Sequence, residues 1–240
     1  MKRAAGLLFG VLFLRAADLC AAEPSLLELA KPEGYSSAIK ILLLLTLLSF
    51  LPALVLAMTS FTRLVVVFSM LRHALGTQQA PPNQIIVGLA LFLTFFIMQP
   101  VWVAVYEGSL VPYLDGQIPE KEALEKALDP MRGFMLQQTR KTDLSLFLEL
   151  SKTPAVREAS EVPTSVLIPS FITSELKTAF EISFLLYIPF LVIDMVVASV
   201  LMSMGMMLLP PVMIALPFKL MLFVLVDGWN LVVESLVKSF

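Results

Sequence analysis

Residues 189–219 read PFLVIDMVVASVLMSMGMMLLPPVMIALPFK. Apolar residues fill both ends of this stretch, and three helix breakers interrupt its middle: Gly205, Pro210 and Pro211. Long apolar segments favour helices in a membrane because lipid cannot satisfy free backbone N–H and C=O groups. The sequence therefore predicts a helical hairpin over 179–240. Its methionine-rich loop spans 202–211, between apolar helices over 182–201 and 212–233.

Three ionisable residues lie inside these apolar helices: Asp194, Lys219 and Asp227. An ionised group at the middle of a bilayer costs about 2.5–3.5 kcal/mol on insertion scales, so it is expected to face protein, water or another charge. If the hairpin turns near Leu208, a rise of about 1.5 Å per residue brings Asp194 and Lys219 to similar depths. We expect these two to form an ion pair, within one chain or across copies. The alternative is that the charges only satisfy helix packing.

Methionine is concentrated around the same hairpin, since seven of the 13 methionines fall in residues 195–221. Its side chain is unbranched and polarizable and can repack around varied shapes. A ring of such loops, one from each copy, would close a pore by excluding water and could still pass chemically varied cargo. The alternative is ordinary filling of gaps in a buried helix.

Two further uncharged runs, 41–62 and 84–106, are 22 and 23 residues long. Each is long enough to cross about 30 Å of hydrocarbon. The segment between them, 63–83, carries two arginines and no acid, which favours a cytoplasmic loop. A first helical hairpin is therefore expected over 41–106.

Residues 107–178 are the polar part of the chain and contain six prolines. Three helices are expected to begin in this segment, at Pro119-Glu120, at Thr142-Asp143 and at Pro169-Ser170. With two crossings before it, the segment is expected in the periplasm as a small helical insert. About 70 residues bury little core of their own, so the insert is expected to pack on the membrane helices or on other copies.

The N-terminus has the layout of a secretory signal peptide. A basic start at Met1-Lys2-Arg3 precedes a short apolar run, and the small pair Ala21-Ala22 precedes Glu23. Cleavage is expected near the end of 1–22, and 23–40 would then form an exported leader. The alternative is an uncleaved N-terminal anchor.

Composition excludes most other classes. The 240 residues are 58% apolar and 15% charged, whereas soluble domains average about 45–50% and about 25%. A net charge of −2 offers no basic field for nucleic acid. One histidine, one cysteine and no phosphate-binding or zinc-protease motif give no basis for a metal, a cofactor or catalysis, so no enzyme is expected. The predicted fold class is an all-α membrane protein with four apolar helices in two hairpins and a helical insert between the second and third.

Several long motifs resemble the FliP family of flagellar biosynthesis proteins. They are TSFTR at 59–63, LRHALGTQQAPPNQ at 71–84, GLALFLTFF at 88–96, PFLVID at 189–194, VASVLMSMGMM at 197–207, LPFK at 216–219 and FVLVDGW at 223–229. The resemblance extends over roughly residues 40–240. The signal peptide and the motif at 71–84 are more similar to the flagellar branch than to the sister subunit of virulence type III secretion systems.

The resemblance implies a core subunit of the flagellar type III export gate, in the bacterial inner membrane within the basal body. In that family five copies assemble with FliR and FliQ into a closed channel, near FlhA and FlhB, that passes unfolded flagellar subunits outward. The family's methionine loop closes the pore, and the motif match carries this role onto Met204, Met206 and Met207. The family's helices are largely raised above the bilayer in the assembled gate, which would explain charges at positions such as Asp194 and Asp227.

Two other functions stay open from the residues alone. A small-molecule or ion transporter would use the buried aspartate and lysine as a relay, although transporters usually carry internal repeats and more helices. A purely structural membrane scaffold would need no seal at all.

Overall fold

The computed structural model describes residue 39 and residues 41–42, 45–46, 48–50, 52–53, 56–77, 79–152, 161–206 and 209–240. The predicted signal peptide 1–22, nearly all of the leader 23–40, and Met207 lie outside these residues. Within them every regular element is helical and none is a strand. The chain divides into two units, 1–53 and 54–240. The described residues of the first unit are helical, and the second unit carries the rest of the fold.

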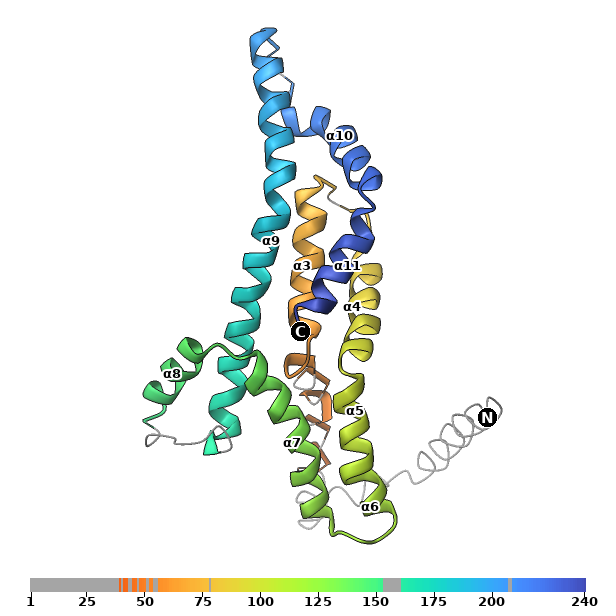
Figure 1. Ribbon diagram of the computed structural model, residues 1–240, viewed down its shortest axis with the longest axis vertical. Helices are drawn as coiled ribbons and strands as arrows, with labels where there is room; N and C mark the ends of the chain where they lie inside the picture. The colour runs from red at the N-terminus through yellow and green to blue at the C-terminus, as the bar shows by residue number, and fades with distance from the viewer. Residues whose placement is uncertain are drawn as a thin grey trace, which may run out of the picture. The chain divides into compact units, whose positions relative to one another are not determined.

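The second unit contains ten described elements, coloured along the chain in Figure 1. They are α3 (Phe61–Ala74), α4 (Asn83–Ile97), α5 (Gln99–Val105), the π-helical turn η1 (Tyr106–Leu110), α6 (Val111–Leu114), α7 (Glu120–Gln138), α8 (Lys141–Leu150), α9 (Thr164–Ser203), α10 (Pro211–Leu225) and α11 (Gly228–Lys238).

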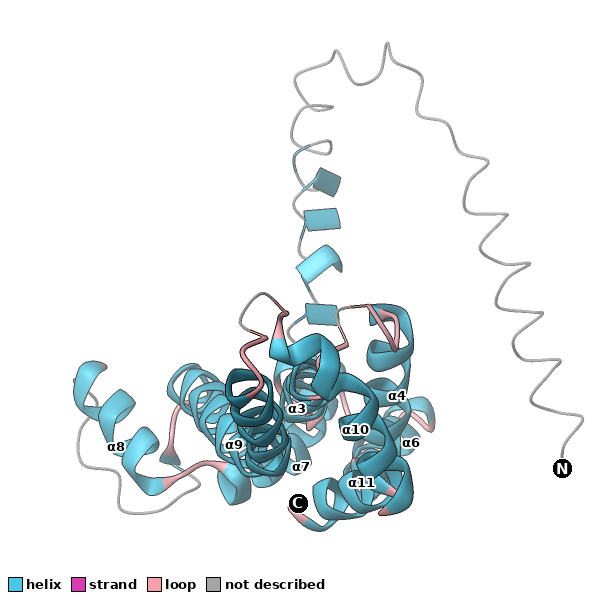
Figure 2. Ribbon diagram, turned by 90° about the horizontal axis from the view of Figure 1, so that it is seen from above, coloured by secondary structure: helices cyan, strands magenta, loops and turns pink. Residues whose placement is uncertain are grey.

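Helix α3 lies at the centre of this unit, between α9 and α4 in both Figure 1 and Figure 2. Its buried positions recur every three or four residues, the spacing of one helix face: Arg63, Leu64, Val67, Phe68, Leu71 and Ala74. The apolar members of this face form one core with residues from α4, α9, α10 and α11. Burial of each large apolar side chain contributes about 1.5–3 kcal/mol, so this core holds the four surrounding helices to α3.

A second, smaller core joins α7 to the start of α9. It contains Met135, Val162, Val166, Leu167 and Phe171, and α8 packs against its edge. This core explains why α9 begins before the predicted start at Pro169. Burial of three apolar residues between Thr164 and Phe171 outweighs the one backbone hydrogen bond that a proline inside the helix removes.

Of the two preceding helices, α7 begins at the predicted residue and α8 does not. Helix α7 begins at Glu120 directly after Pro119, as predicted, with two glutamates in its first turn, where the helix dipole favours negative charge. Helix α8 begins at Lys141, and the predicted cap by Thr142-Asp143 is wrong. The N-cap residue of α8 is Arg140, whose side chain makes no capping hydrogen bond to the helix. The backbone N–H of Arg140 donates to Ser174 Oγ on α9 at 2.7 Å.

The single apolar helix predicted over 212–233 is wrong, because α10 and α11 are separate and bent by 65°. Asp227 adopts the left-handed conformation between them, with φ of 52°. An aspartate tolerates this conformation better than most residues. Directly after it, Gly228 contacts the Phe223 ring so closely that an added Cβ would lie 2.3 Å from it.

Among the described helices, α9 alone is long and apolar enough to cross a membrane by itself. Two bent pairs, Asn83–Ile97 with Gln99–Leu114 and Pro211–Leu225 with Gly228–Lys238, raise the number to three if each counts as one span. The all-helical fold is thus confirmed. The four apolar helices in two hairpins and the periplasmic placement of 107–178 stay predictions.

Replacement of Gly228 by alanine should destabilise the fold by about 1–3 kcal/mol, because overpacking forces the Phe223 ring away from Phe190 and Trp229. Thermal unfolding of the detergent-solubilised chain, followed by helix content, measures this. Gly133→Ala in α7 is the matched control, since nothing lies within 4 Å of its added Cβ. A Gly228→Ala chain that melts with the parent would contradict the close packing of this bend.

Candidate functional site at the α9–α10 hairpin

The turn between α9 and α10 has a defined helix stop. Gly205 has φ of 74°, its N–H donates to Met202 O at 3.0 Å, and the N–H of Met206 donates to Leu201 O at 3.0 Å. These two bonds form a Schellman motif, which satisfies carbonyls at a helix end and favours glycine. Gly205, a predicted helix breaker, therefore lies where α9 ends.

The prolines define the other side of the turn. Pro210 is extended, with ψ of 116°, and Pro211 is the first residue of α10. Proline suits this position because its fixed φ matches a helix and its missing N–H would have no partner there. We call residues 202–211 the tip; its described residues include the glycine stop of α9 and the proline start of α10.

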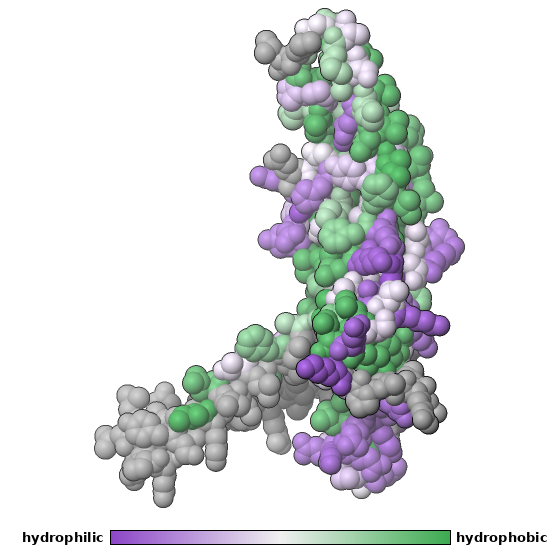
Figure 3. Space-filling view, turned by 90° about the vertical axis from the view of Figure 1, so that its left-hand side faces the viewer, coloured by the Kyte–Doolittle hydropathy of each residue, from purple (hydrophilic) through white to green (hydrophobic). Residues whose placement is uncertain are grey.

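Exposed apolar side chains cover the tip. Met204 is 67% exposed, and its apolar neighbours are exposed as well: Met202, Met206 and Leu209. No charged residue occurs between Asp194 and Lys219. In Figure 3 hydrophobic residues dominate the upper part of the visible face, and hydrophilic residues gather at the middle and lower end. In the isolated chain this apolar surface is exposed. Such exposure is typical of a surface that binds a partner or lines a pore.

Lys219 and Asp194 form the expected ion pair within one chain. Lys219 Nζ lies 2.6 Å from Asp194 Oδ2 and also donates to Ala74 O at 3.1 Å. The lysine side chain is 2% exposed and the aspartate 26%. Ala74 ends α3, where free carbonyls and the helix dipole attract a positive charge. The pair thus joins α9 and α10 to the end of α3, at the base of the tip.

The other oxygen of Asp194, Oδ1, is buried and has no hydrogen-bond partner in the described structure. Asp227, the third expected buried charge, is exposed in the isolated chain, and its Oδ2 accepts a bond from Asn230 Nδ2. The expectation that Asp227 lies buried inside a helix is therefore wrong for this chain. Its place is the bend between α10 and α11.

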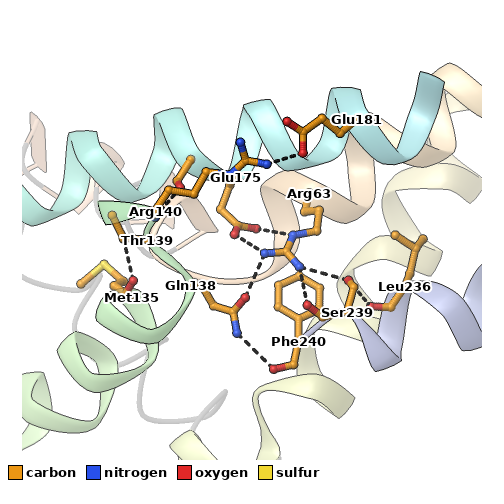
Figure 4. Close-up of polar contacts among 11 residues, drawn as sticks. Arg63, Met135, Gln138, Thr139, Arg140, Glu175, Glu181, Leu236, Ser239 and Phe240 are labelled. Atoms are coloured by element: carbon orange, nitrogen blue, oxygen red, sulfur yellow. Dashed lines mark hydrogen bonds and ion pairs between the residues drawn. The ribbon is translucent and has the colours of Figure 1, made fainter. Parts of the chain in front are cut away.

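A second buried ion pair, between Arg63 and Glu175, was not predicted. Arg63 Nε donates to Glu175 Oε2 at 2.9 Å, and its Nη2 donates to Glu175 Oε1 and to Gln138 Oε1 (Figure 4). The two charged side chains are 2% and 0% exposed. Arg63 Nη1 donates to the backbone and hydroxyl oxygens of Ser239, at 2.9 and 3.0 Å. We call this set of contacts, completed by Phe240, the Arg63 junction.

The Arg63 junction brings together two predicted segments that are far apart in the sequence. Arg63 is the first residue of the predicted loop 63–83 and Glu175 belongs to the predicted insert 107–178, and their side chains are in direct contact. The sequence did carry a signal of burial, since Arg63 shares the apolar face of the helix with Val67 and Leu71. Nothing in that pattern identifies its partner 112 positions away.

A surface ion pair lies beside this junction. Arg140 Nη2 contacts Glu181 on α9 (Figure 4). The hydrogen bond to Glu181 raises the pKa of Arg140 above its ordinary value, so the guanidinium stays charged. Among the described residues, no three His, Cys, Asp or Glu side chains lie together as metal ligands would.

The chain with both Asp194→Ala and Lys219→Met should be less destabilised than the sum of the two single changes, by about 1–3 kcal/mol. Each single change leaves one partly or fully buried charge unpaired, and the double change leaves none. The Asp194→Ala change should cost more, because the charge that it leaves is on the more buried side chain. Unfolding of all four chains in detergent measures the coupling.

The exposed pair of Glu234 and Lys238 supplies the control cycle, since both side chains are more than half exposed. It should show no measurable coupling. Strictly additive effects at Asp194 and Lys219 would contradict an energetically coupled pair.

Comparison with known proteins agrees with the motifs of the hairpin. The profile of the FliP family matches residues 44–236. The flagellar biosynthetic protein FliP of Pectobacterium carotovorum subsp. carotovorum is 53% identical over 238 residues, which cover 98% of this chain and 92% of that protein. The FliP of Bacillus subtilis (strain 168) is 54% identical over 209 residues, or 87% of this chain and 95% of that protein.

The FliP of Cereibacter sphaeroides is 56% identical over 207 residues, or 86% of this chain and 69% of that protein. Proteins of this family are structural components of the flagellar export apparatus rather than enzymes. Because the profile covers most of the sequence and these relatives are more than half identical to it, the chain belongs to the FliP family of flagellar biosynthetic proteins.

Proposed function

We propose that this chain is a channel-forming subunit of the flagellar type III export gate, that it passes unfolded flagellar subunits across the inner membrane, and that its tip seals the closed pore. The observation that carries this proposal is the exposed, charge-free, methionine-rich surface of the tip. Apolar constrictions hold back ions because water leaves them. Flexible methionine side chains can part around many different cargo residues and close again.

The base of the tip supports the same function. The Asp194–Lys219 pair joins α9 to α10, and the bond from Lys219 to the carbonyl of Ala74 holds both against α3. The glycine stop ends α9 at a fixed residue. Only the side chains beyond this base need to move when cargo enters. Met204 and Met206 are the described residues to which the sealing role is assigned, and the family motif extends it to Met207.

The surface of the unit supports assembly in several copies. Large apolar side chains are exposed on three helices, among them Phe92 on α4 at 79%, Phe184 on α9 at 68% and Leu225 on α10 at 76%. Exposed large apolar side chains in such number are typical of contacts with protein or lipid. We assign it to neighbouring copies, to FliQ and FliR, and to the inner membrane. Five copies and nearby FlhA and FlhB complete the proposed gate.

A second candidate, an ion relay through the ion pair, is favoured by the buried, unpartnered Oδ1 of Asp194. The two functions differ in which residues control ion flux. A seal depends on the side chains of the tip, whereas a relay depends on Asp194 and Lys219.

Met204→Ala combined with Met206→Ala should raise ion leakage through the assembled gate severalfold, because smaller side chains leave the constriction wide enough to stay wet. Conductance of bilayers holding the chain together with its gate partners measures this. Met221→Ala is the matched control, since Met221 is 56% exposed but lies beyond Lys219, away from the tip. Unchanged leakage in the double variant would remove the seal and favour a scaffold. Flux lost only on Lys219→Met would favour the relay.

Native mass measurement of the detergent-extracted protein should show a discrete multimer that recruits both FliQ and FliR. Association would remove the exposed apolar side chains of α4, α9 and α10 from water, which is favourable. A stable monomer that binds neither partner would contradict a channel built from several copies.

A further inference from the structure

The Arg63 junction uses every hydrogen-bond donor that an arginine has. Of five N–H groups, Nε and one of Nη2 go to Glu175, and the second of Nη2 goes to Gln138. The remaining two, both on Nη1, go to the backbone oxygen and the hydroxyl of Ser239. Two of the five acceptors therefore belong to one residue that follows α11, and without it two donors of a buried guanidinium would be unsatisfied.

Phe240 covers the same guanidinium. The Arg63 Cζ lies 3.8 Å from the centroid of the Phe240 ring, a cation–π contact. The ring also stacks on Phe134 of α7, with centroids 6.2 Å apart and planes at 21°. The backbone oxygen of Phe240 accepts a bond from Gln138 Nε2 at 3.1 Å. Two consecutive residues after α11 thus contact both α3 and α7.

These two residues form the outer layer of the junction. Ser239 is exposed and Phe240 is half-buried, whereas Arg63 beneath them is 2% exposed. If the cover leaves, Glu175 still neutralises the guanidinium.

The helix that carries this cover is attached at a bend. Helix α11 meets α10 at 65° beside the left-handed Asp227. Beyond the bend, α10 is held separately, through Lys219 and its bonds to Asp194 and Ala74. The segment 211–240 is therefore fixed at two distant points with a turn between them. Val232 and Leu236 supply the apolar contacts of α11 with the core.

The cover also lines a groove of the second unit. This groove has a volume of about 550 Å³, and its lining includes Val237, Phe240, Pro100 of α5 and Pro130 of α7. Departure of Phe240 would widen the groove and expose the face of Phe134.

We propose that Ser239 and Phe240 form a latch, which fastens α11 to the Arg63 junction and whose release lets α11 move about the Asp227–Gly228 bend while α10 stays in place. The latch goes beyond the sealing role of the tip, since it controls a different helix. It makes α11 the part of the second unit that moves, while α10 stays bonded to α9 and α3.

Hydrogen–deuterium exchange of the full detergent-solubilised chain tests the latch. Ser239→Ala with Phe240→Ala should raise exchange of the α11 amides about tenfold, because it removes the bond from the guanidinium to Ser239 Oγ and the cation–π contact with Phe240. Amides of α10 and of the end of α9 should exchange as in the parent. Lys238→Ala is the matched control, because Lys238 precedes the latch but bonds only to the exposed Glu234. Lys238→Ala should leave the exchange of the α11 amides as in the parent.

Two single changes refine the test. Ser239→Ala alone removes one of the two bonds to Arg63 Nη1 and should give a smaller rise confined to α11. Phe240→Tyr keeps the ring over the guanidinium and should behave as the parent. An unchanged α11 in the double variant overturns the latch. So does a rise of equal size in α3, α9 and α10, because the two residues would then support the whole fold rather than one helix.

Discussion

The buried pair of Arg63 and Glu175 is the constraint on which the arrangement of the unit depends. An arginine that is 2% exposed and a glutamate that is 0% exposed are tolerated only if their donors and acceptors are satisfied. That requirement brings α3, α7, α9 and the residues after α11 to one point, as Figure 4 shows. Any arrangement that separates α3 from α9 leaves both charges unpaired in the core, so the pair favours this packing over alternatives of similar hydrophobicity.

Helix α3 transmits this constraint to the hairpin. Its first turn is held by Arg63, and its last residue, Ala74, accepts a bond from Lys219. Two buried cations thus lie at opposite ends of one short central helix, each paired with a carboxylate of α9. Because α9 is a single helix from Thr164 to Ser203, the Arg63 junction and the base of the tip are parts of the same rigid frame. A seal at the tip needs such a frame, since a loose hairpin would not meet its neighbours in register.

Local rules predicted local features well. The start of α7 after Pro119, the stop at Gly205 and the start at Pro211 depend on the conformations of the residues themselves. The Asp194–Lys219 pair was predictable because both charges lie in one hairpin, where spacing along two helices decides depth. The predicted starts of α9 and α8 are wrong, because contacts with α7 and with Ser174 outweigh local capping.

The sequence by itself determined that the chain is helical and apolar, which family it resembles, where the methionine-rich turn lies and which two charges meet beneath it. Those properties follow from composition, motifs and the spacing of residues within one hairpin. Only the tertiary structure decided that Arg63 pairs with Glu175, that α10 and α11 part at Asp227, and that Ser239 and Phe240 close the junction. The contacts of Arg63 with Glu175, Ser239 and Phe240 join residues more than a hundred positions apart. No local periodicity encodes them, because what selects the partner is the need to satisfy a buried charge.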